Sequence, residues 1–219
     1  MPPPLRFYFD YISHNAYIAW TQIHPLAARY GRAVEPMPVL FAGLLNAHGQ
    51  KGPAEIPAKA WWMAKDLLRK AARLGVPMHP PASHPFNPLL SLRASLVPQE
   101  RSRQQALIDA LFRATWVEGR DVSTADVIAA VGTAVGLDGA ALVAATHTDG
   151  IKQRLRRETD AAIAQGVFGV PTVIVDDELF WGYDDFAHLE LFLAGKDPLD
   201  RTAAAEWLRI RPTASRQRS

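Results

Sequence analysis

Residues 166–175 of this 219-residue chain read Gly166-Val167-Phe168-Gly169-Val170-Pro171-Thr172-Val173-Ile174-Val175. The β-branched run 172–175 predicts a short strand, and the Asp176-Asp177 turn followed by residues 179–181 predicts a hairpin. A proline that enters a strand behind a glycine and a small hydrophobic residue favours a cis peptide bond, which would turn the backbone of Val170 toward an extended peptide. The alternative is an ordinary trans proline at the start of a strand.

A second informative segment, where a strand leads into a helix, lies near the N-terminus. Residues 5–9, Leu-Arg-Phe-Tyr-Phe, predict a strand that stops at Asp10. The apolar pattern from 16 to 30 predicts a helix that is kinked at Pro25 and ends at Gly31.

Helical patterns fill most of the chain between these two segments. Residues 33–40 first predict a strand at the edge of the sheet, because Pro36 and Pro38 cannot donate hydrogen bonds to a neighbouring strand. Helices are then predicted over 57–74, 89–96, 101–117, 123–135, 139–145, 149–165 and 186–195. The layout is therefore βαβ, a block of helices, and then ββα.

Chemistry is first expected in the turn Asp10-Tyr11-Ile12-Ser13-His14-Asn15. A helix N-terminus has unpaired amide hydrogens and the positive end of the helix dipole, so it stabilises an anion. A Ser13 hydroxyl at this place can donate a hydrogen bond to a bound thiolate. Lowering a thiol pKa by about two units from ~8.5 takes roughly 2.7 kcal/mol. The alternative is that Ser13 only caps the helix, which is the commoner role of serine there.

The composition excludes several kinds of function. The chain has no cysteine, which rules out disulfides, thiolate metal sites and a dithiol redox cycle of its own. Its seven histidines are scattered, which argues against a metal site. The net charge is +2, with a basic C-terminal end that is weak evidence for nucleic-acid binding. No apolar run has the length of a membrane span and no secretory signal is visible, so we expect a cytoplasmic protein without membrane or nucleic-acid partners.

Taken together, the two segments resemble one family. The matching stretches are 9–13, 49–53, 57–59, 166–172 and 181–185. They resemble the 2-hydroxychromene-2-carboxylate isomerases and the related kappa-class glutathione transferases, within the DsbA-like thioredoxin superfamily. The resemblance runs from Phe7 to about Leu193.

This resemblance implies an α/β fold of the DsbA type. A thioredoxin-like βαβ…ββα domain, residues 1–42 and 166–205, would be interrupted by a large all-helical insertion, residues 43–165. Residues 206–219 are expected to form a disordered tail. Glutathione would lie between the two domains.

Members of such families use the serine after the first strand to face the sulfur of glutathione, and Ser13 holds that position. Further glutathione contacts are implied at Gln50, Val170, Pro171, Tyr183 and Asp184. The Asp184 carboxylate lies at a helix start, where it can accept a hydrogen bond from an α-ammonium group while the helix dipole offsets its charge. Its alternative role is a helix cap.

One position departs from the family pattern. A proline and a bulky residue usually follow the serine, whereas this chain has His14 and Asn15. Both are candidates for glutathione binding. His14 is expected to be a solvated residue of the first turn, or alternatively to hold a proton near neutral pH and add positive charge beside the thiolate. Asn15 is expected to hydrogen-bond the substrate or to satisfy the turn.

Trp62 and Lys59 are the predicted substrate contacts, both in the inserted helices. Trp61 falls on the apolar stripe of its helix and is expected in the core, whereas Trp62 lies off the stripe and is available to an aromatic pocket. Lys59, or alternatively Lys51, is expected to pair with a substrate carboxylate. Trp116 is expected to have a structural role.

The implied activity is a glutathione-dependent isomerisation of an aromatic, unsaturated oxo-acid, of the type 2-hydroxychromene-2-carboxylate to trans-o-hydroxybenzylidenepyruvate. The thiolate adds reversibly to the conjugated system, and glutathione is regenerated as a cofactor. Two alternatives remain open. One is a kappa-like transferase or peroxidase that consumes glutathione, and the other is a non-catalytic thiol-peptide binding protein. Relatives of this kind also imply a homodimer.

Overall fold

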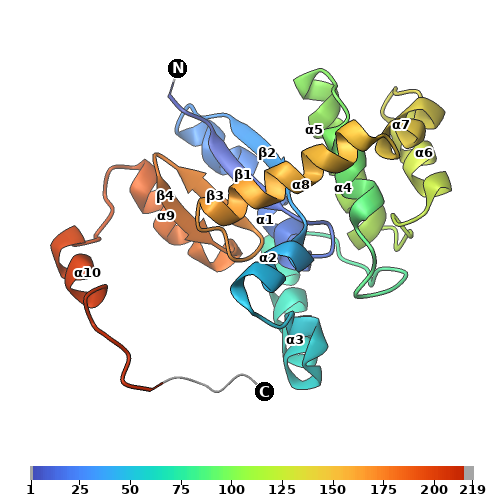
Figure 1. Ribbon diagram of the computed structural model, residues 1–219. Coiled ribbons are helices and arrows are strands. Elements are labelled where there is room, and N and C mark those ends of the chain that lie inside the picture. Colours follow the sequence, from blue (N-terminus) through green and yellow to red (C-terminus); the bar gives the residue numbers. More distant parts are fainter. Residues whose placement is uncertain (1, 215–219) are drawn as a thin grey trace.

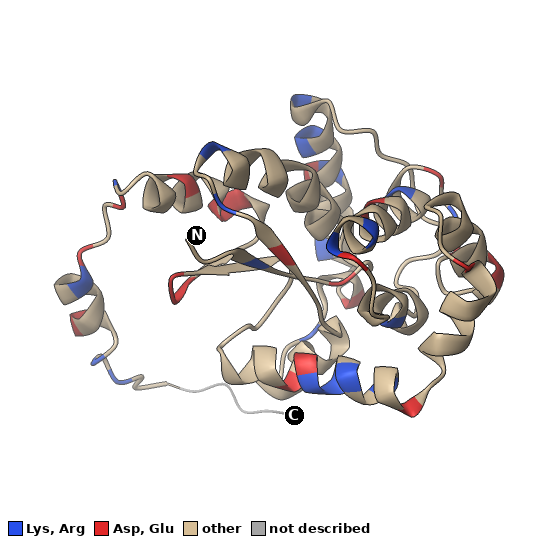
Figure 2. Cartoon of the chain, turned by 90° about the horizontal axis from the view of Figure 1, so that it is seen from above, with Lys and Arg blue, Asp and Glu red and all other residues tan. Residues whose placement is uncertain are grey.

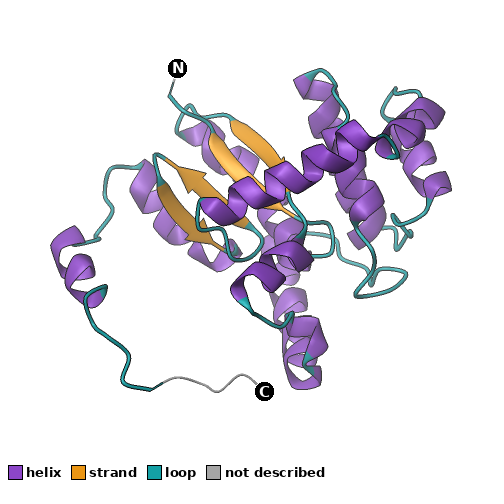
Figure 3. Ribbon diagram, viewed as in Figure 1, coloured by secondary structure: helices purple, strands orange, loops and turns teal. Residues whose placement is uncertain are grey.

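The computed structural model describes residues 2–214, and within them a four-stranded sheet carries helices on both faces (Figures 1 and 3). The strand order is β2-β1-β3-β4. Strand β1 (Leu5–Phe9) pairs in parallel with β2 (Val34–Pro38) and antiparallel with β3 (Thr172–Val175). Strand β3 forms a hairpin with β4 (Glu178–Trp181). The proline-containing β2 therefore lies at the edge of the sheet, as predicted.

Helices make up most of the rest of the described chain. Their bounds are α1 His14–Arg29, α2 Phe41–His48, η1 Pro53–Glu55, α3 Pro57–Leu74, α4 Leu89–Leu96, α5 Arg101–Trp116, α6 Ala125–Ala134, α7 Gly139–Thr146, α8 Asp149–Ala164, η2 Tyr183–Asp185, α9 Phe186–Leu193 and α10 Arg201–Trp207. The long predicted helices are confirmed, α3 to the residue. The short helices α2 and α10 are not among the predictions. The segment of α2 carries weak helix signals, because Gly43 lies inside it and Leu40 provides no side-chain cap.

The alternation of side chains along β1 gives the sheet its two apolar faces. Phe7 and Phe9 are fully buried in the cluster that also holds α1 and α9. Tyr8, between them, points to the opposite face and packs with Leu44 of α2 and Ala162 of α8. This period of two is the expected geometry of a strand buried on both sides.

The inserted helices share the core of the sheet instead of forming a separate one. Phe112 of α5 lies 5.4 Å from the ring of Phe9 and 4.7 Å from that of Tyr11, measured between centroids. Trp20 of α1 joins the same aromatic cluster. Because one cluster contains residues from both parts, the end of β1 is held rigidly against the insertion.

Asp10 fixes the turn that follows β1. Its side chain is fully buried and accepts hydrogen bonds from the amides of Ile12, at 3.1 Å, and Phe41, at 2.9 Å. Burial raises the pKa of Asp10 to about 7, and the two amide hydrogen bonds only partly offset that rise. This carboxyl group therefore ties the β1–α1 turn to the start of α2.

The C-terminal segment projects from the body of the molecule (Figure 1). Helix α10 crosses the boundary that the sequence predicts between the domain and its tail, at residues 205 and 206. Residues 215–219 of the predicted tail lie outside the described residues. Among the described helices, none has the length and apolarity to cross a membrane. Acidic and basic residues are interspersed along the helices (Figure 2).

Candidate functional site

The two segments that decide the sequence analysis meet in space. The Ser13 hydroxyl donates a hydrogen bond of 3.3 Å to the carbonyl oxygen of Val170, 157 positions away in the chain. The Val170–Pro171 peptide bond is cis, as predicted. Ser13 also caps α1, since its Oγ accepts a hydrogen bond of 3.1 Å from the amide of Ala16. Ser13 is therefore the N-cap of α1, and its hydroxyl makes a second hydrogen bond beyond the cap.

The Ser13 hydroxyl can donate its proton while it caps the helix, because a hydroxyl accepts and donates at the same time. Its hydrogen now takes part in a long hydrogen bond to a neutral carbonyl, which a stronger acceptor can replace. A thiolate is an anionic acceptor and forms a stronger hydrogen bond than a neutral carbonyl. The first amides of the 16-residue helix α1 lie beside the hydroxyl and favour negative charge.

Val170 offers backbone groups at the same point. Its side chain is buried, and among the described residues its amide donates no hydrogen bond. The carbonyl of Pro171 accepts a bond of 2.8 Å from Gly182, which brings the turn after β4 to the cis-proline. Gly182 has φ +80°, a conformation that favours glycine. We call Ser13, Asn15, Val170, Pro171 and the turn 182–184 the Ser13 junction.

Asp184 forms the outer side of the Ser13 junction. Its carboxylate, 69% exposed, accepts a bond of 2.7 Å from Lys70 of α3. Lys70 is only 12% exposed and also pairs with Asp66 at 2.8 Å. Among the described residues Asp184 accepts no backbone hydrogen bond, so its alternative role as a helix cap is wrong. Asp185 instead accepts the bond from the amide of Trp181.

The side chains of Asn15 and His14 lie in different surroundings, Asn15 in the Ser13 junction and His14 outside it. The Asn15 amide nitrogen lies 3.5 Å from the position that a Cβ on Gly182 would take, so this side chain faces the turn after β4. Its Oδ1 is buried and has no hydrogen-bond partner among the described residues. His14 instead lines a cavity to which Ser13 and Asn15 do not contribute.

The prediction of a solvated His14 is wrong. Both ring nitrogens are buried and lack hydrogen-bond partners among the described residues. Burial lowers the pKa of His14 to about 4, helped by the nearby charges of His84 and Lys70 and opposed by that of Asp66. The alternative of a protonated His14 near neutral pH is therefore wrong as well, because the imidazole is uncharged at pH 7.

The cavity has a volume of about 230 Å³ and lies between α3, the 78–84 loop and the start of α1. We call it the α3 cavity. Its lining is apolar apart from three imidazoles, and consists of His14, Ala54, Ala60, Met63, Ala64, Leu67, Leu68, Met78, His79, Pro80, Pro81, His84 and Trp116. Trp116 is both structural and part of this lining, since its Nε1 donates a 2.9 Å bond to the carbonyl of Tyr11.

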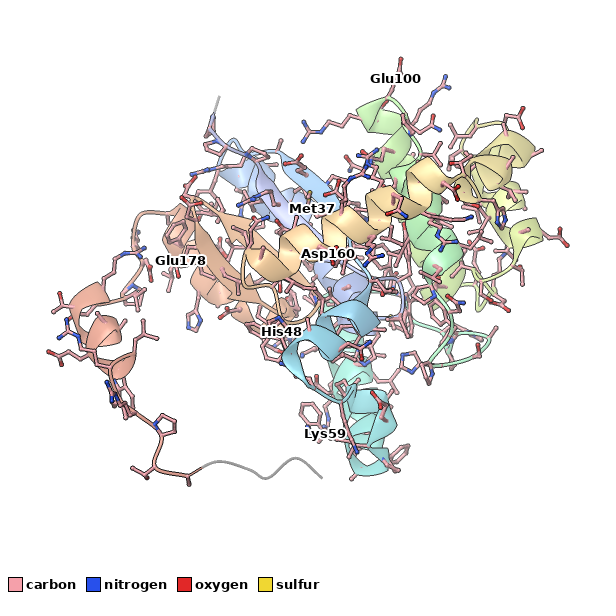
Figure 4. The ribbon with its side chains drawn as sticks, viewed as in Figure 1. Met37, His48, Lys59, Glu100, Asp160 and Glu178 are labelled. Atoms are coloured by element: carbon pink, nitrogen blue, oxygen red, sulfur yellow. The ribbon has the colours of Figure 1, made fainter. Side chains whose placement is uncertain are left out.

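The two predicted substrate contacts do not line the α3 cavity. Lys59 and Trp62 lie on α3 but are absent from its lining, and Trp62 is 58% exposed. Figure 4 shows Lys59 near the outer end of α3. Trp61 is 68% exposed, so its predicted burial is wrong. The buried stripe was misplaced because α3 protrudes and covers the cavity with only part of its surface.

Gln50 lies on the exposed loop after α2, where Gly49 ends the helix in the left-handed conformation. The neighbouring His48, labelled in Figure 4, contacts the carbonyl of Val167 through Nε2 at 3.2 Å. This contact brings the end of α2 to the loop that carries the cis-proline. No hydrogen bond places the Gln50 side chain itself within the described structure.

A model of the DSBA-like thioredoxin domain matches residues 4–194. The chain belongs to the DSBA-like thioredoxin domain family. It is 32% identical over 195 residues to a 2-hydroxychromene-2-carboxylate isomerase of Sphingobium xenophagum, which covers 88% of this chain and 99% of that protein. It is 28% identical over 207 residues to glutathione S-transferase kappa 2 of Caenorhabditis elegans, which covers 87% of this chain and 91% of that protein.

Solved structures agree with this assignment. A structure of 2-hydroxychromene-2-carboxylate isomerase superimposes with a TM-score of 0.80 and 26% identity, over 94% of this chain and 96% of that one. The cytosolic disulfide reductase DsbM of Pseudomonas aeruginosa, solved with GSH, shares the fold, with a TM-score of 0.60 and 18% identity over 94% of this chain and all of that one. This DSBA-like protein thus belongs with the 2-hydroxychromene-2-carboxylate isomerases, and it is an enzyme of the isomerase type.

The groups at the Ser13 junction fit a thiol-containing peptide. Within the described part of the chain, the Val170 amide makes no hydrogen bond and can donate to a carbonyl of the peptide. The Asn15 Oδ1 atom has no partner there and can accept from an N–H group. The Ser13 hydroxyl makes only a long hydrogen bond and can donate to a sulfur anion. A metal centre has no such basis, since the described residues contain no group of three or more potential ligands. Sequence reasoning missed Lys70 and His84, neither of which belongs to a recognisable motif, and it treated Asp10 only as the residue at which the first strand stops.

Proposed function

We propose that this DSBA-like protein is a glutathione-dependent isomerase of an aromatic, unsaturated oxo-acid of the 2-hydroxychromene-2-carboxylate type. The observation that carries the proposal is the 3.3 Å contact between the Ser13 hydroxyl and the Val170 carbonyl. It joins a helix N-terminus, suited to an anion, with an unpaired backbone edge, suited to a peptide, directly beside an apolar cavity. The names of the relatives supply the reaction type.

In this proposal the Ser13 junction holds glutathione. The Val170 backbone pairs with the peptide, Asp184 binds the α-ammonium group, and the side chain of Gln50 contributes an amide. Tyr183 and Asn15 complete the enclosure. Lys70 already neutralises Asp184 and becomes available to a glutathione carboxylate once the ammonium group takes its place.

When bound, glutathione supplies the thiolate whose reversible addition turns a conjugated double bond into a rotatable single bond. Ser13 and the α1 amides hold negative charge on the sulfur, both before addition and after expulsion. The α3 cavity excludes water from the aromatic ring, while Trp116 and the Met63 side chain provide its apolar walls.

Product analysis tests the proposal. Purified protein is incubated with 2-hydroxychromene-2-carboxylate, with and without reduced glutathione, and the products are separated by chromatography. The proposal expects trans-o-hydroxybenzylidenepyruvate only with glutathione present, and glutathione recovered unchanged. Consumption of glutathione into a conjugate or disulfide would indicate the transferase or peroxidase alternative, and no turnover of any kind would favour the thiol-peptide binding protein.

Two variants make the assay specific for the Ser13 hydroxyl. Ser13→Ala removes a helix cap and a proton donor, whereas Asp138→Ala removes only a cap, since the Asp138 carboxylate accepts from the Ala141 amide at 2.9 Å in α7. The proposal expects turnover to fall about 10²- to 10³-fold in Ser13→Ala, as when one donor to a developing anion is lost. Asp138→Ala is expected to keep near wild-type turnover.

We also propose, on the family resemblance alone, that the protein acts in the cytoplasm and as a homodimer. Sedimentation equilibrium checks the second statement, because a monomer of 24.1 kDa and its dimer are well separated in mass.

A further inference from the structure

His14 is the polar group of the α3 cavity that the protein itself leaves without a partner. Its ring lies edge-on to Trp116, with centroids 5.9 Å apart, and parallel to His84 at 6.5 Å. Packing therefore holds the ring in place, while both nitrogens are buried with no hydrogen bond among the described residues. Buried polar groups are rarely left in this state unless another molecule supplies the partner.

The other two imidazoles of the lining are already engaged. His84 contacts the carbonyl of Ile12 through Nε2 at 3.0 Å, and His79 contacts that of Pro80 through Nδ1 at 2.7 Å. His79 and His84 are exposed, whereas His14, next to Ser13 in the chain, is partly buried and has both ring nitrogens enclosed. His14 is thus the imidazole with donor and acceptor both available where a substrate meets the Ser13 junction.

The α3 cavity carries no fixed charge. Its lining contains no lysine, arginine, aspartate or glutamate. The charged groups nearest to His14 are Lys70 and Asp66 of α3, which pair with each other at 2.8 Å, and His84 of the loop is its titratable neighbour. A neutral imidazole offers one N–H donor and one lone pair. An apolar cavity favours an uncharged ligand group, because burial of a charge without a counter-charge is costly.

We propose that His14 is the substrate-orienting hydrogen-bond donor of the α3 cavity, and that the cavity takes the uncharged aromatic part of the substrate through one carbonyl oxygen. A carboxylate on the same molecule stays outside the cavity. The inference rests on the proposed function for its setting, and it moves His14 from the glutathione side, where the sequence suggested it, to the substrate side.

Chromone, an uncharged bicyclic aromatic enone, is a direct probe of this contact. Its matched control is 4H-chromene, the same bicycle without the carbonyl oxygen. Affinities are measured by calorimetry on the full chain, with and without glutathione, for the wild type, His14→Phe and His14→Gln. Phenylalanine keeps the ring packing and removes both nitrogens, while glutamine keeps an N–H donor.

The proposal expects His14→Phe to bind chromone about tenfold more weakly and 4H-chromene within about twofold of the wild type. His14→Gln is expected to recover chromone affinity to within about threefold. Equal losses for both compounds in His14→Phe would overturn the proposal and make His14 a packing residue. Failure of chromone to bind the wild type, or unchanged chromone affinity in His14→Phe, would overturn it as well.

Two further readouts are independent of turnover. In ¹⁵N spectra of the imidazole nitrogens, the His14 ring is expected to stay neutral at pH 6 and its N–H signal to shift when chromone binds. A charged His14 at pH 6, or an unchanged signal with chromone bound, would contradict the proposal. Chromone-2-carboxylate is expected to bind no tighter than chromone, and a tenfold gain would reveal a cation that the cavity lining lacks.

The failure of the proposed function is distinguishable from the failure of this inference. Glutathione binding is followed through the thiolate absorbance in His14→Phe, where it is expected to match the wild type. If neither protein binds glutathione while chromone recognition depends on His14, the glutathione proposal fails and the His14 contact stands.

Discussion

The Ser13 junction and the α3 cavity share no residue and are formed by different kinds of chemical group. The junction consists mainly of backbone groups and short polar side chains from segments far apart in the chain, held by the sheet core. The cavity consists of apolar side chains from α3 and the 78–84 loop, with a single uncommitted imidazole. Backbone geometry can recognise a peptide with almost any neighbouring sequence, whereas an apolar cavity selects by the shape of its side chains.

The comparison implies that substitutions in the Ser13 junction and in the α3 cavity impair different binding functions. A change in the junction should alter glutathione affinity and thiol acidity without altering the cavity ligand, and a change in the cavity should do the reverse. Sites without shared contacts usually contribute additively to free energy.

Asp184→Asn is expected to produce the largest effect on glutathione affinity. The neutral amide cannot form the charge-assisted hydrogen bond to an ammonium group, so the dissociation constant for glutathione should rise between about tenfold and a hundredfold. Asp185→Asn is the matched control, because Asp185 bonds the Trp181 amide and His188 instead. Calorimetry with glutathione measures both. A parallel loss of chromone affinity in Asp184→Asn would show that the Ser13 junction and the α3 cavity do not bind their ligands independently.

Ala64→Phe should fill part of the α3 cavity. The added ring competes with the substrate for a volume of about 230 Å³, so KM for an aromatic substrate should rise by about tenfold, with the acidity of bound glutathione unchanged. Ala72→Phe, at an exposed position of the same helix, controls for the general effect of a new aromatic residue. Steady-state kinetics and the thiolate absorbance are the two measurements. Equal KM values for the two variants would show that substrates bind elsewhere.

Asp10→Asn tests the buried carboxyl group that holds the junction in place. Folding raises its pKa from 3.8 to about 7, so between these values the folded chain binds more protons than the unfolded chain, and stability falls as pH rises. This contribution of Asp10 to the unfolding free energy falls by about 2 kcal/mol between pH 5 and pH 7, and the variant should lose it when unfolding is measured by urea titration at both pH values.

His14 is expected to change the unfolding free energy with pH in the opposite direction to Asp10. Its pKa is lowered from 6.5 to about 4 on folding, so it makes stability rise with pH through that window. His14→Phe should therefore steepen the fall that Asp10 causes between pH 5 and pH 7. Identical pH dependence in the wild type and Asp10→Asn would show that Asp10 is not the group responsible.

Lys59→Ala and Trp62→Ala should have the smallest effect. Both residues lie on α3 outside the lining of the cavity, so KM for an aromatic substrate should change by less than about twofold. Leu67→Ala, which changes the lining itself, is the positive control. A large effect of Trp62→Ala would restore the substrate contact that the sequence suggested.

The sequence was informative where local chemistry determines the backbone. The run 166–175, the strand 5–9 and the N-cap at Ser13 each follow from residue types at short range, and the structure confirms them. The sequence was misleading where tertiary packing decides. Trp61 occupies a stripe typical of a buried helix face, but α3 protrudes and leaves it in solvent.

His14 illustrates the same limit at the site. A lone histidine in a first turn is usually solvated, and only the approach of His84 and Trp116 from distant segments buries this one. Lys70 likewise belongs to no motif, and its place beside Asp184 follows from the packing of α3 and η2 against α1. Contacts between residues from distant segments cannot be recognised in a single sequence.

The most direct test of the account is a thiolate titration. Wild-type protein and Ser13→Ala are titrated with reduced glutathione, and the absorbance near 240 nm is followed across pH. The account predicts saturable binding with the thiol pKa lowered by about two units from ~8.5 in the wild type, and restored toward that value in Ser13→Ala. No saturable binding at millimolar glutathione, or the same lowered pKa in both proteins, would contradict it.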